Sequence, residues 1–118
     1  MKLTALIAAL TLGTSAALAA PAAVSDSGVM ADKAGMTLYI FDKDAPGVSN
    51  CAGGCADSWP PFLAGSDAAA EGDFTLVTRA DGKAQWAFKE MPLYYWAGDK
   101  RPGQTNGDGV GGVWHVVK

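Results

Sequence analysis

The side chains with the greatest capacity for chemistry are two cysteines, Cys51 and Cys55, which three residues separate. Gly53 and Gly54 lie between them and let the chain curl until the two Cα atoms come within the ~6 Å that a disulfide requires. We therefore expect a Cys51–Cys55 disulfide. Because so short a loop removes little entropy from the unfolded chain, this bond should fix a local hook rather than join distant parts.

A redox or copper site is the alternative use of Cys51 and Cys55, with His115 or a methionine as a further ligand. The Cys-x3-Cys spacing differs from the Cys-x2-Cys of thioredoxin-like sites, and no histidine follows to make a haem attachment. Copper and zinc sites use more thiolate or imidazole ligands than this chain offers, because His115 is its one histidine. We expect no cofactor, with copper as the alternative, and interpret His115 as an ordinary strand residue.

Acidic residues offer weaker chemistry. Asp42 and Asp44 precede Gly47 with the spacing that opens a calcium loop, and Asn106 and Asp108 precede another glycine in the same way. Neither stretch has the glutamate that closes such a loop, so we interpret both as turns. No nucleophile-and-base motif is present. We expect no catalysis, and a small hydrolase that uses an acid pair is the weakest of the alternatives.

An internal repeat organises the elements that carry these residues. Residues 38–44 (LYIFDKD) return as residues 93–99 (LYYWAGD), at an offset of 55 residues. At the same offset a tryptophan closes each copy. The recurring motif residues are Tyr39, Phe41, Asp44 and Trp59 in the first copy and Tyr94, Trp96, Asp99 and Trp114 in the second. Two copies of one unit, about 29–63 and about 84–118, therefore make up most of the chain.

Strand signals dominate both copies. Runs of β-branched and aromatic residues predict strands at 36–41, 74–78, 85–88, 93–96 and 113–117, with a short one near 29–31. Only residues 67–72 could form a turn of helix. Alternation along a strand places Tyr39 and Phe41 on one face and Leu38 and Ile40 on the other, and both sets need cover. We therefore predict an all-β fold, a small antiparallel sheet or sandwich built from two pseudo-repeats.

The motif tyrosines and aromatic residues have two interpretations. They could form a stacking platform for a sugar, a flavin-like ring or an aromatic ligand. The favoured interpretation is core packing, in which the tyrosine hydroxyls bond to acids or to loop backbone. Asp44 and Asp99 would then anchor the glycine-rich loops by accepting backbone N–H groups. The loops differ between the copies, so function is expected in the parts that the copies do not share.

The N-terminal residues indicate export. Residues 1–19 read as a signal peptide, with a lysine, an apolar run and a small-x-small cleavage site that ends at Ala19. Residues 20–28 should form a flexible arm, and residues 29–118 a single β domain. The net charge of −3 argues against nucleic acid, which needs a basic face. We expect a periplasmic or secreted monomer with no transmembrane segment in the mature chain, whose partner is an envelope component or a small ligand.

The repeat also carries a family resemblance. The pattern Tyr-x-(Phe/Trp/Tyr)-x-x-Asp, present at Tyr39 to Asp44 and at Tyr94 to Asp99, resembles a bacterial family of secreted or lipoprotein repeat proteins. The resemblance covers roughly residues 28–118. The resemblance implies an exported protein and says almost nothing about activity, because the family is of unknown function. From the residues themselves, we expect an exported cell-envelope protein with a binding or structural role. Many members carry a lipid-anchoring cysteine, and we expect no such anchor here because no cysteine lies at the cleavage site.

Overall fold

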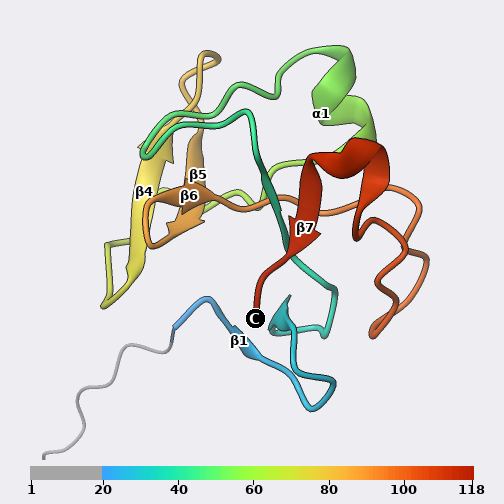
Figure 1. The fold of residues 1–118 in the computed structure, drawn as a ribbon. Helices are drawn as coiled ribbons and strands as arrows, with labels where there is room; N and C mark the ends of the chain where they lie inside the picture. The colour runs from blue at the N-terminus through green and yellow to red at the C-terminus, as the bar shows by residue number, and fades with distance from the viewer. Residues whose placement is uncertain (1–19) are drawn as a thin grey trace, which may run out of the picture.

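Small antiparallel sheets account for nearly all the regular structure. Figure 1 shows the computed structural model, which describes residues 20–118, so the expected signal peptide lies outside the described residues. The elements in chain order are β1 (Ala22–Val24), β2 (Met30–Asp32), β3 (Tyr39–Phe41), α1 (Gly54–Ser58), β4 (Phe74–Thr78), β5 (Ala84–Phe88), β6 (Met91–Pro92), a 3-10 turn η2 (Val110–Gly112) and β7 (Trp114–Val116). β1 pairs with β2, β3 with β7, and β4, β5 and β6 form a three-stranded sheet. The predicted all-β class is confirmed.

The two repeats exchange strands. β3 of the first repeat pairs with β7 of the second, with Tyr39 opposite Val116. In return, Tyr94 of the second repeat bridges to Pro61 of the first. Between these two pairings, Tyr39 and Tyr94 face each other and exchange both backbone hydrogen bonds, with N–O distances of 2.8 and 3.0 Å. A local two-fold axis therefore passes between the two motif tyrosines, and each repeat supplies a strand that the other needs.

Two apolar layers cover the two faces of these strands, as the alternation predicts. The aliphatic layer is built around the buried residues Ala22, Met30, Leu38, Phe74, Leu93 and Val117, with Ile40 and Tyr95 packed against it. The aromatic layer contains Tyr39, Phe41, Cys51, Trp59, Tyr94 and Trp114, with Trp96 packed against it. Neighbouring residues of one strand thus enter different layers, which fixes the register of both copies because a slip by one residue would exchange their faces.

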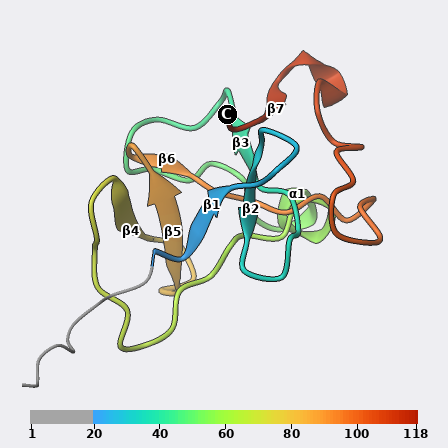
Figure 2. The same ribbon diagram turned by 90° about the horizontal axis from the view of Figure 1, so that it is seen from below.

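The β1–β2 hairpin lies at the lower side of Figure 1. In Figure 2, the view from below, it lies between the β4–β5–β6 sheet and the segment of η2 and β7. The predicted flexible arm over 20–28 is therefore wrong for Ala22–Val24, which forms β1. This segment is ordered because it pairs with the free edge of β2 and buries Ala22 in the aliphatic layer.

The helical turn expected at 67–72 is also wrong. That segment is irregular and mostly exposed, because its alanines offer no apolar stripe to bury and six residues are too few to be helical alone. The α-helix of the described residues is α1, which begins at Gly54 within the loop that Cys51 and Cys55 close and ends beyond it at Ser58. Residues 93–96 make isolated bridges rather than the predicted continuous strand, since Tyr94 is shared between Tyr39 and Pro61.

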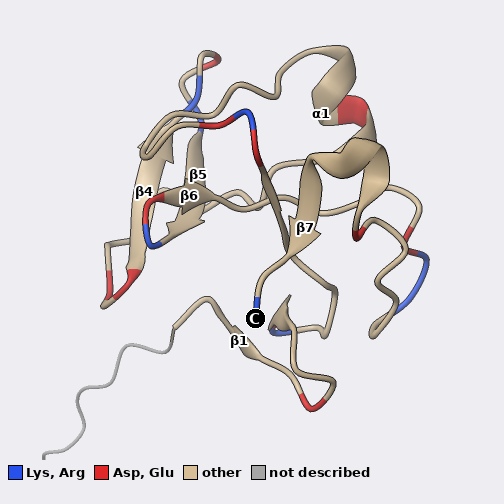
Figure 3. Cartoon of the chain, in the orientation of Figure 1, with Lys and Arg blue, Asp and Glu red and all other residues tan. Residues whose placement is uncertain are grey.

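Charged residues are dispersed. Figure 3 shows lysine and arginine scattered over separate loops, with aspartate and glutamate interspersed among them. No helix within residues 20–118 has the length and apolar character to cross a membrane.

Candidate functional site

The motif tyrosines and aspartates bond across the repeats. Tyr39 Oη donates to Asp99 Oδ2 at 2.6 Å, and Tyr94 Oη donates to Asp44 Oδ2 at 2.8 Å. Both tyrosines are fully buried. Each copy therefore contributes the donor of one pair and the acceptor of the other, which locks the two repeats together.

The same aspartates anchor the two long loops. Asp44 Oδ1 accepts the backbone N–H of Asn50 at 2.7 Å, and Asp99 Oδ1 accepts that of Asn106 at 2.9 Å. The predicted anchoring role is confirmed. The sequence did not reveal that the tyrosine bound to each aspartate belongs to the other repeat.

The motif aromatic residues form one continuous stack. The ring centroids of Phe41 and Trp114 are 4.2 Å apart, those of Trp114 and Trp59 are 3.8 Å apart, and those of Trp59 and Trp96 are 4.2 Å apart. The rings alternate between the copies, and the two central ones are nearly parallel, at 2°. Because its central rings are buried inside the molecule, this stack is a structural core and leaves those rings closed to a ligand.

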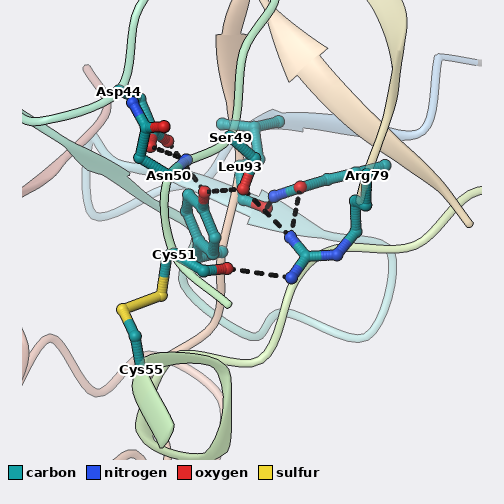
Figure 4. Close-up of a disulfide and its surroundings, with 9 residues drawn as sticks. Asp44, Ser49, Asn50, Cys51, Cys55, Arg79 and Leu93 are labelled. Atoms are coloured by element: carbon teal, nitrogen blue, oxygen red, sulfur yellow. Dashed lines mark hydrogen bonds between the residues drawn. A yellow bond between two sulfur atoms is a disulfide. The ribbon is translucent and has the colours of Figure 1, made fainter. Parts of the chain in front are cut away.

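A buried arginine, Arg79, extends the hydrogen-bond network of Tyr94 and Asp44, as Figure 4 shows. Arg79 donates from Nη1 to Gln85 Oε1 at 2.7 Å and to Ser49 Oγ at 3.1 Å, and from Nη2 to the carbonyl oxygen of Cys51 at 2.9 Å. Since Tyr94 donates to Asp44, the 2.6 Å contact of Ser49 with Tyr94 must be donated by Ser49. Hydrogen bonds therefore run in one direction from the guanidinium towards the Asp44 carboxylate.

The second copy replaces this serine with a backbone amide. Gly107 N donates to Tyr39 Oη at 3.1 Å, in the place that Ser49 holds against Tyr94. A Cβ on Gly107 would lie 2.8 Å from Trp59 Cη2, so a side chain there would collide with the aromatic stack. The two loops thus reach the same tyrosine position by different chemistry.

Burial dominates the titration of this core. Desolvation raises the pKa of Tyr94 to about 12, and it raises the pKa of Tyr39 further, with the hydrogen bond to Asp99 adding to the shift. Burial also raises the pKa of Asp44, against the opposing effects of the Asn50 N–H, the Tyr94 hydroxyl and the charge of Arg79. The hydroxyls are therefore protonated at neutral pH and act as donors.

We predict that stability falls as the pH rises above about 10. Unfolded tyrosine ionises near pH 10, whereas Tyr94 in the fold keeps its proton up to about pH 12. Between these values the unfolded chain binds fewer protons, so raising the pH favours unfolding. Urea unfolding from pH 8 to about pH 11 should show this loss, with a shallower slope for Tyr94→Phe. An equal slope in the variant would contradict the assignment.

The disulfide is present as predicted, with Cys51 and Cys55 Cα atoms 5.2 Å apart. Neither cysteine is a free thiol. His115 Nε2 instead contacts Asp42 Oδ2 at 2.8 Å, and both side chains are about half exposed. Within the part of the chain that the structure describes, no three side chains of His, Cys, Asp or Glu are placed to hold a metal ion.

Removal of the disulfide has a modest expected cost. The double variant Cys51→Ala/Cys55→Ala should lose about 2 kcal/mol of unfolding free energy, since the loop that the bond closes is very short. Urea unfolding measures the loss. Thiol titration of the denatured parent should find no free thiol before reduction. Two stable free thiols would contradict the Cys51–Cys55 disulfide.

An open hollow of about 450 Å³ lies outside this core, between the β1–β2 hairpin and the β4–β5–β6 sheet. Its lining comprises Pro21, Asp32, Lys33, Ala34, Phe62 and Trp86. Tyr95 stands behind it, with its ring packed edge-on against Phe62 at 5.6 Å and its hydroxyl donating to Asp32 Oδ2 at 2.7 Å. The hollow therefore combines aromatic rings with a carboxylate and an ammonium group.

Backbone hydrogen bonds identify the counterparts of Trp86 and Phe62 in the other copy. Trp86 N donates to Phe62 O at 2.9 Å, just as Met30 N donates to Val117 O at 2.6 Å. Leu93 N then donates to the oxygen of Trp86 as Leu38 N donates to that of Met30. Trp86 and Phe62 are thus matched by the aliphatic Met30 and Val117.

Tyr95 follows the same rule, because Ile40 stands at its position in the first copy. All three aromatic residues at the hollow therefore have aliphatic counterparts. Sequence reasoning did not single out Phe62, Trp86 or Tyr95. The plain offset of 55 residues already pairs Phe62 with Val117 and Tyr95 with Ile40. Trp86 and Met30 are 56 positions apart, so that pair needs a one-residue gap before Leu93.

Comparison with known proteins identifies a family and nothing narrower. The profile of a family described as "Secreted repeat of unknown function" matches residues 22–62 and again residues 75–118. No curated protein and no solved structure matches the chain. The two matched segments correspond to the two copies that exchange strands.

Proposed function

The chain belongs to this family of secreted repeats of unknown function, and from that premise we propose that it is an exported binding protein of the cell envelope without catalytic activity. It acts in the periplasm or outside the cell, where its two cysteines stay oxidised. It works as a monomer, a proposal that the pairing of the two repeats supports, since each supplies to the other the backbone partners that it needs. The site is the hollow beside Trp86.

One observation carries this proposal: the two copies differ where the hollow lies. The reciprocal tyrosine–aspartate pairs and the aromatic stack use the residues that the copies share, and these are needed for folding. Trp86 and Tyr95 of the second copy and Phe62 of the first are each aromatic where the counterpart in the other copy is aliphatic. A volume of about 450 Å³ also falls in the range of small-molecule sites, which combine apolar walls with a few fixed polar groups.

The test gives each aromatic residue at the hollow the side chain of its counterpart in the other copy. The triple variant Phe62→Val/Trp86→Met/Tyr95→Ile contains side chains that the same backbone already holds elsewhere. Trp96→Phe makes the equivalent exchange in the aromatic stack, away from the hollow, and serves as the matched control. Both variants and the parent are screened by thermal shift against small saccharides and planar aromatic compounds.

A ligand at a hundred times its Kd should stabilise the parent by about 2.7 kcal/mol and raise its Tm. Trp96→Phe should keep that shift and the triple variant should lose it. A shift that survives in the triple variant, or no shift with any compound, would contradict the proposal.

A further inference from the structure

The polar groups at the hollow narrow the ligand class. Resting on the proposed function, we propose that the hollow binds a neutral sugar ring, whose apolar C–H face stacks on Trp86 and whose neighbouring hydroxyls bond to Asp32 and Lys33. This inference depends on three features of the site: a fixed acceptor, an adjacent donor and an aromatic wall.

The acceptor is the Asp32 carboxylate, which the fold holds in place. Its Oδ1 accepts the backbone N–H groups of Ala34 and Met36, each at 2.9 Å, and its Oδ2 accepts the Tyr95 hydroxyl at 2.7 Å. A carboxylate has about four acceptor positions, so one remains, at Oδ2. Because three bonds already orient this group, little side-chain freedom is lost when a ligand uses the fourth position.

The donor is Lys33, which follows Asp32 directly and also lines the hollow. Lys33 is an exposed residue, and its ammonium group provides N–H donors on a flexible stem. Two adjacent residues thus offer one acceptor and one donor. Neighbouring hydroxyls on a sugar match this pair, because one hydroxyl can donate to the carboxylate while the next accepts from the ammonium group.

The wall contains two aromatic rings. Trp86 and Phe62 line the hollow, and both are partly exposed. The negative face of an aromatic ring attracts the weakly positive C–H groups of a sugar. A flat aromatic compound would use this wall but would leave Asp32 and Lys33 without partners, and a ligand anion would lie beside the Asp32 charge. A neutral ring with several hydroxyls satisfies all three features.

The experiment titrates the purified protein by calorimetry with methyl β-glucopyranoside, methyl β-galactopyranoside and N-acetylglucosamine. Glucuronate represents an anionic sugar, and indole and riboflavin represent flat aromatic compounds. At least one neutral saccharide should bind more tightly than any other probe. Asp32→Asn should weaken that binding about tenfold, because it removes a charged hydrogen-bond acceptor.

Lys33→Met provides a second variant, because it leaves every hydrogen bond of Asp32 intact. It should also weaken saccharide binding, whereas Trp96→Phe should leave the Kd unchanged. Tighter binding of indole, riboflavin or glucuronate through Trp86 would overturn the sugar assignment and leave the proposed binding function standing. Saccharide affinity equal to the parent's in both Asp32→Asn and Lys33→Met would overturn it as well. Failure of every probe to bind would overturn both.

Discussion

Arg79→Met is expected to lower the free energy of unfolding by about 3–5 kcal/mol, the cost of removing one partner from a buried charged network. Arg79 is 7 % exposed and donates to three groups, Ser49, Gln85 and the carbonyl oxygen of Cys51. Methionine can fill the space but donates nothing. The variant would also leave the buried Asp44 carboxylate without the positive charge that favours its ionised form.

Urea unfolding at neutral pH measures this loss, with Arg101→Met as the matched control. Arg101 has an exposed side chain and lies in a loop of the second copy. Its replacement should change stability by no more than about 0.5 kcal/mol, as is usual on the surface. A cost for Arg79→Met as small as that of the control would mean that the hydrogen-bonded chain from Arg79 to Asp44 does not hold the core together.

Trp114→Ala should cost about 3–5 kcal/mol, the usual penalty for deleting a large buried ring. Trp114 is 4 % exposed, stacks between Phe41 and Trp59, and meets the edge of Tyr94 at 5.2 Å. Its loss removes contacts with the first copy on both ring faces. The cavity would therefore lie between the two repeats and weaken the packing that joins them.

Trp96→Ala tests whether position in the stack matters. Trp96 lies at one end, is partly exposed and stacks on a single ring, Trp59. Its removal should cost clearly less than that of Trp114 in the same urea experiment. Equal costs would show that the central pair contributes no more than an ordinary aromatic contact.

The fold class and the two faces of the repeat strands could be predicted from the sequence because both depend on local patterns. Alternation assigned Tyr39 and Leu38 to opposite layers, and the layers observed agree. Spacing likewise predicted the disulfide, since Cys51 and Cys55 are close in the chain and flexible glycines separate them. The roles of Asp44 and Asp99 as loop anchors followed from the turn chemistry of aspartate.

The exchange between repeats could not be predicted in this way. Tyr39 and Asp99 are 60 residues apart, and two copies of one motif bond equally well within a copy or across copies when only spacing is known. Ala22–Val24 had no strand signal of its own, because its ordering depends on the edge that β2 offers. Arg79 follows a predicted strand and drew no prediction from the sequence, because its burial depends on the tertiary structure.

The hollow escaped detection for a related reason. Its lining joins Asp32 and Lys33 of the hairpin with Phe62 and Trp86, which are far apart in the sequence. None of these residues belongs to the repeated motif. The duplicated motif builds a scaffold that both copies share. Phe62, Trp86 and Tyr95, which are aromatic where their counterparts are aliphatic, distinguish the proposed binding surface from that core.

Nuclear magnetic resonance of the nitrogen-labelled protein, titrated with the best saccharide, tests the central claim most directly. Binding at the hollow should shift the backbone amides of Asp32, Lys33 and Ala34 and the indole N–H of Trp86, with the signals of Trp59 and Trp114 unmoved. In the triple variant Phe62→Val/Trp86→Met/Tyr95→Ile, the amide shifts should disappear. Shifts centred on the aromatic stack, or unchanged amide shifts in the triple variant, would contradict the claim that the ligand site lies where the two copies differ.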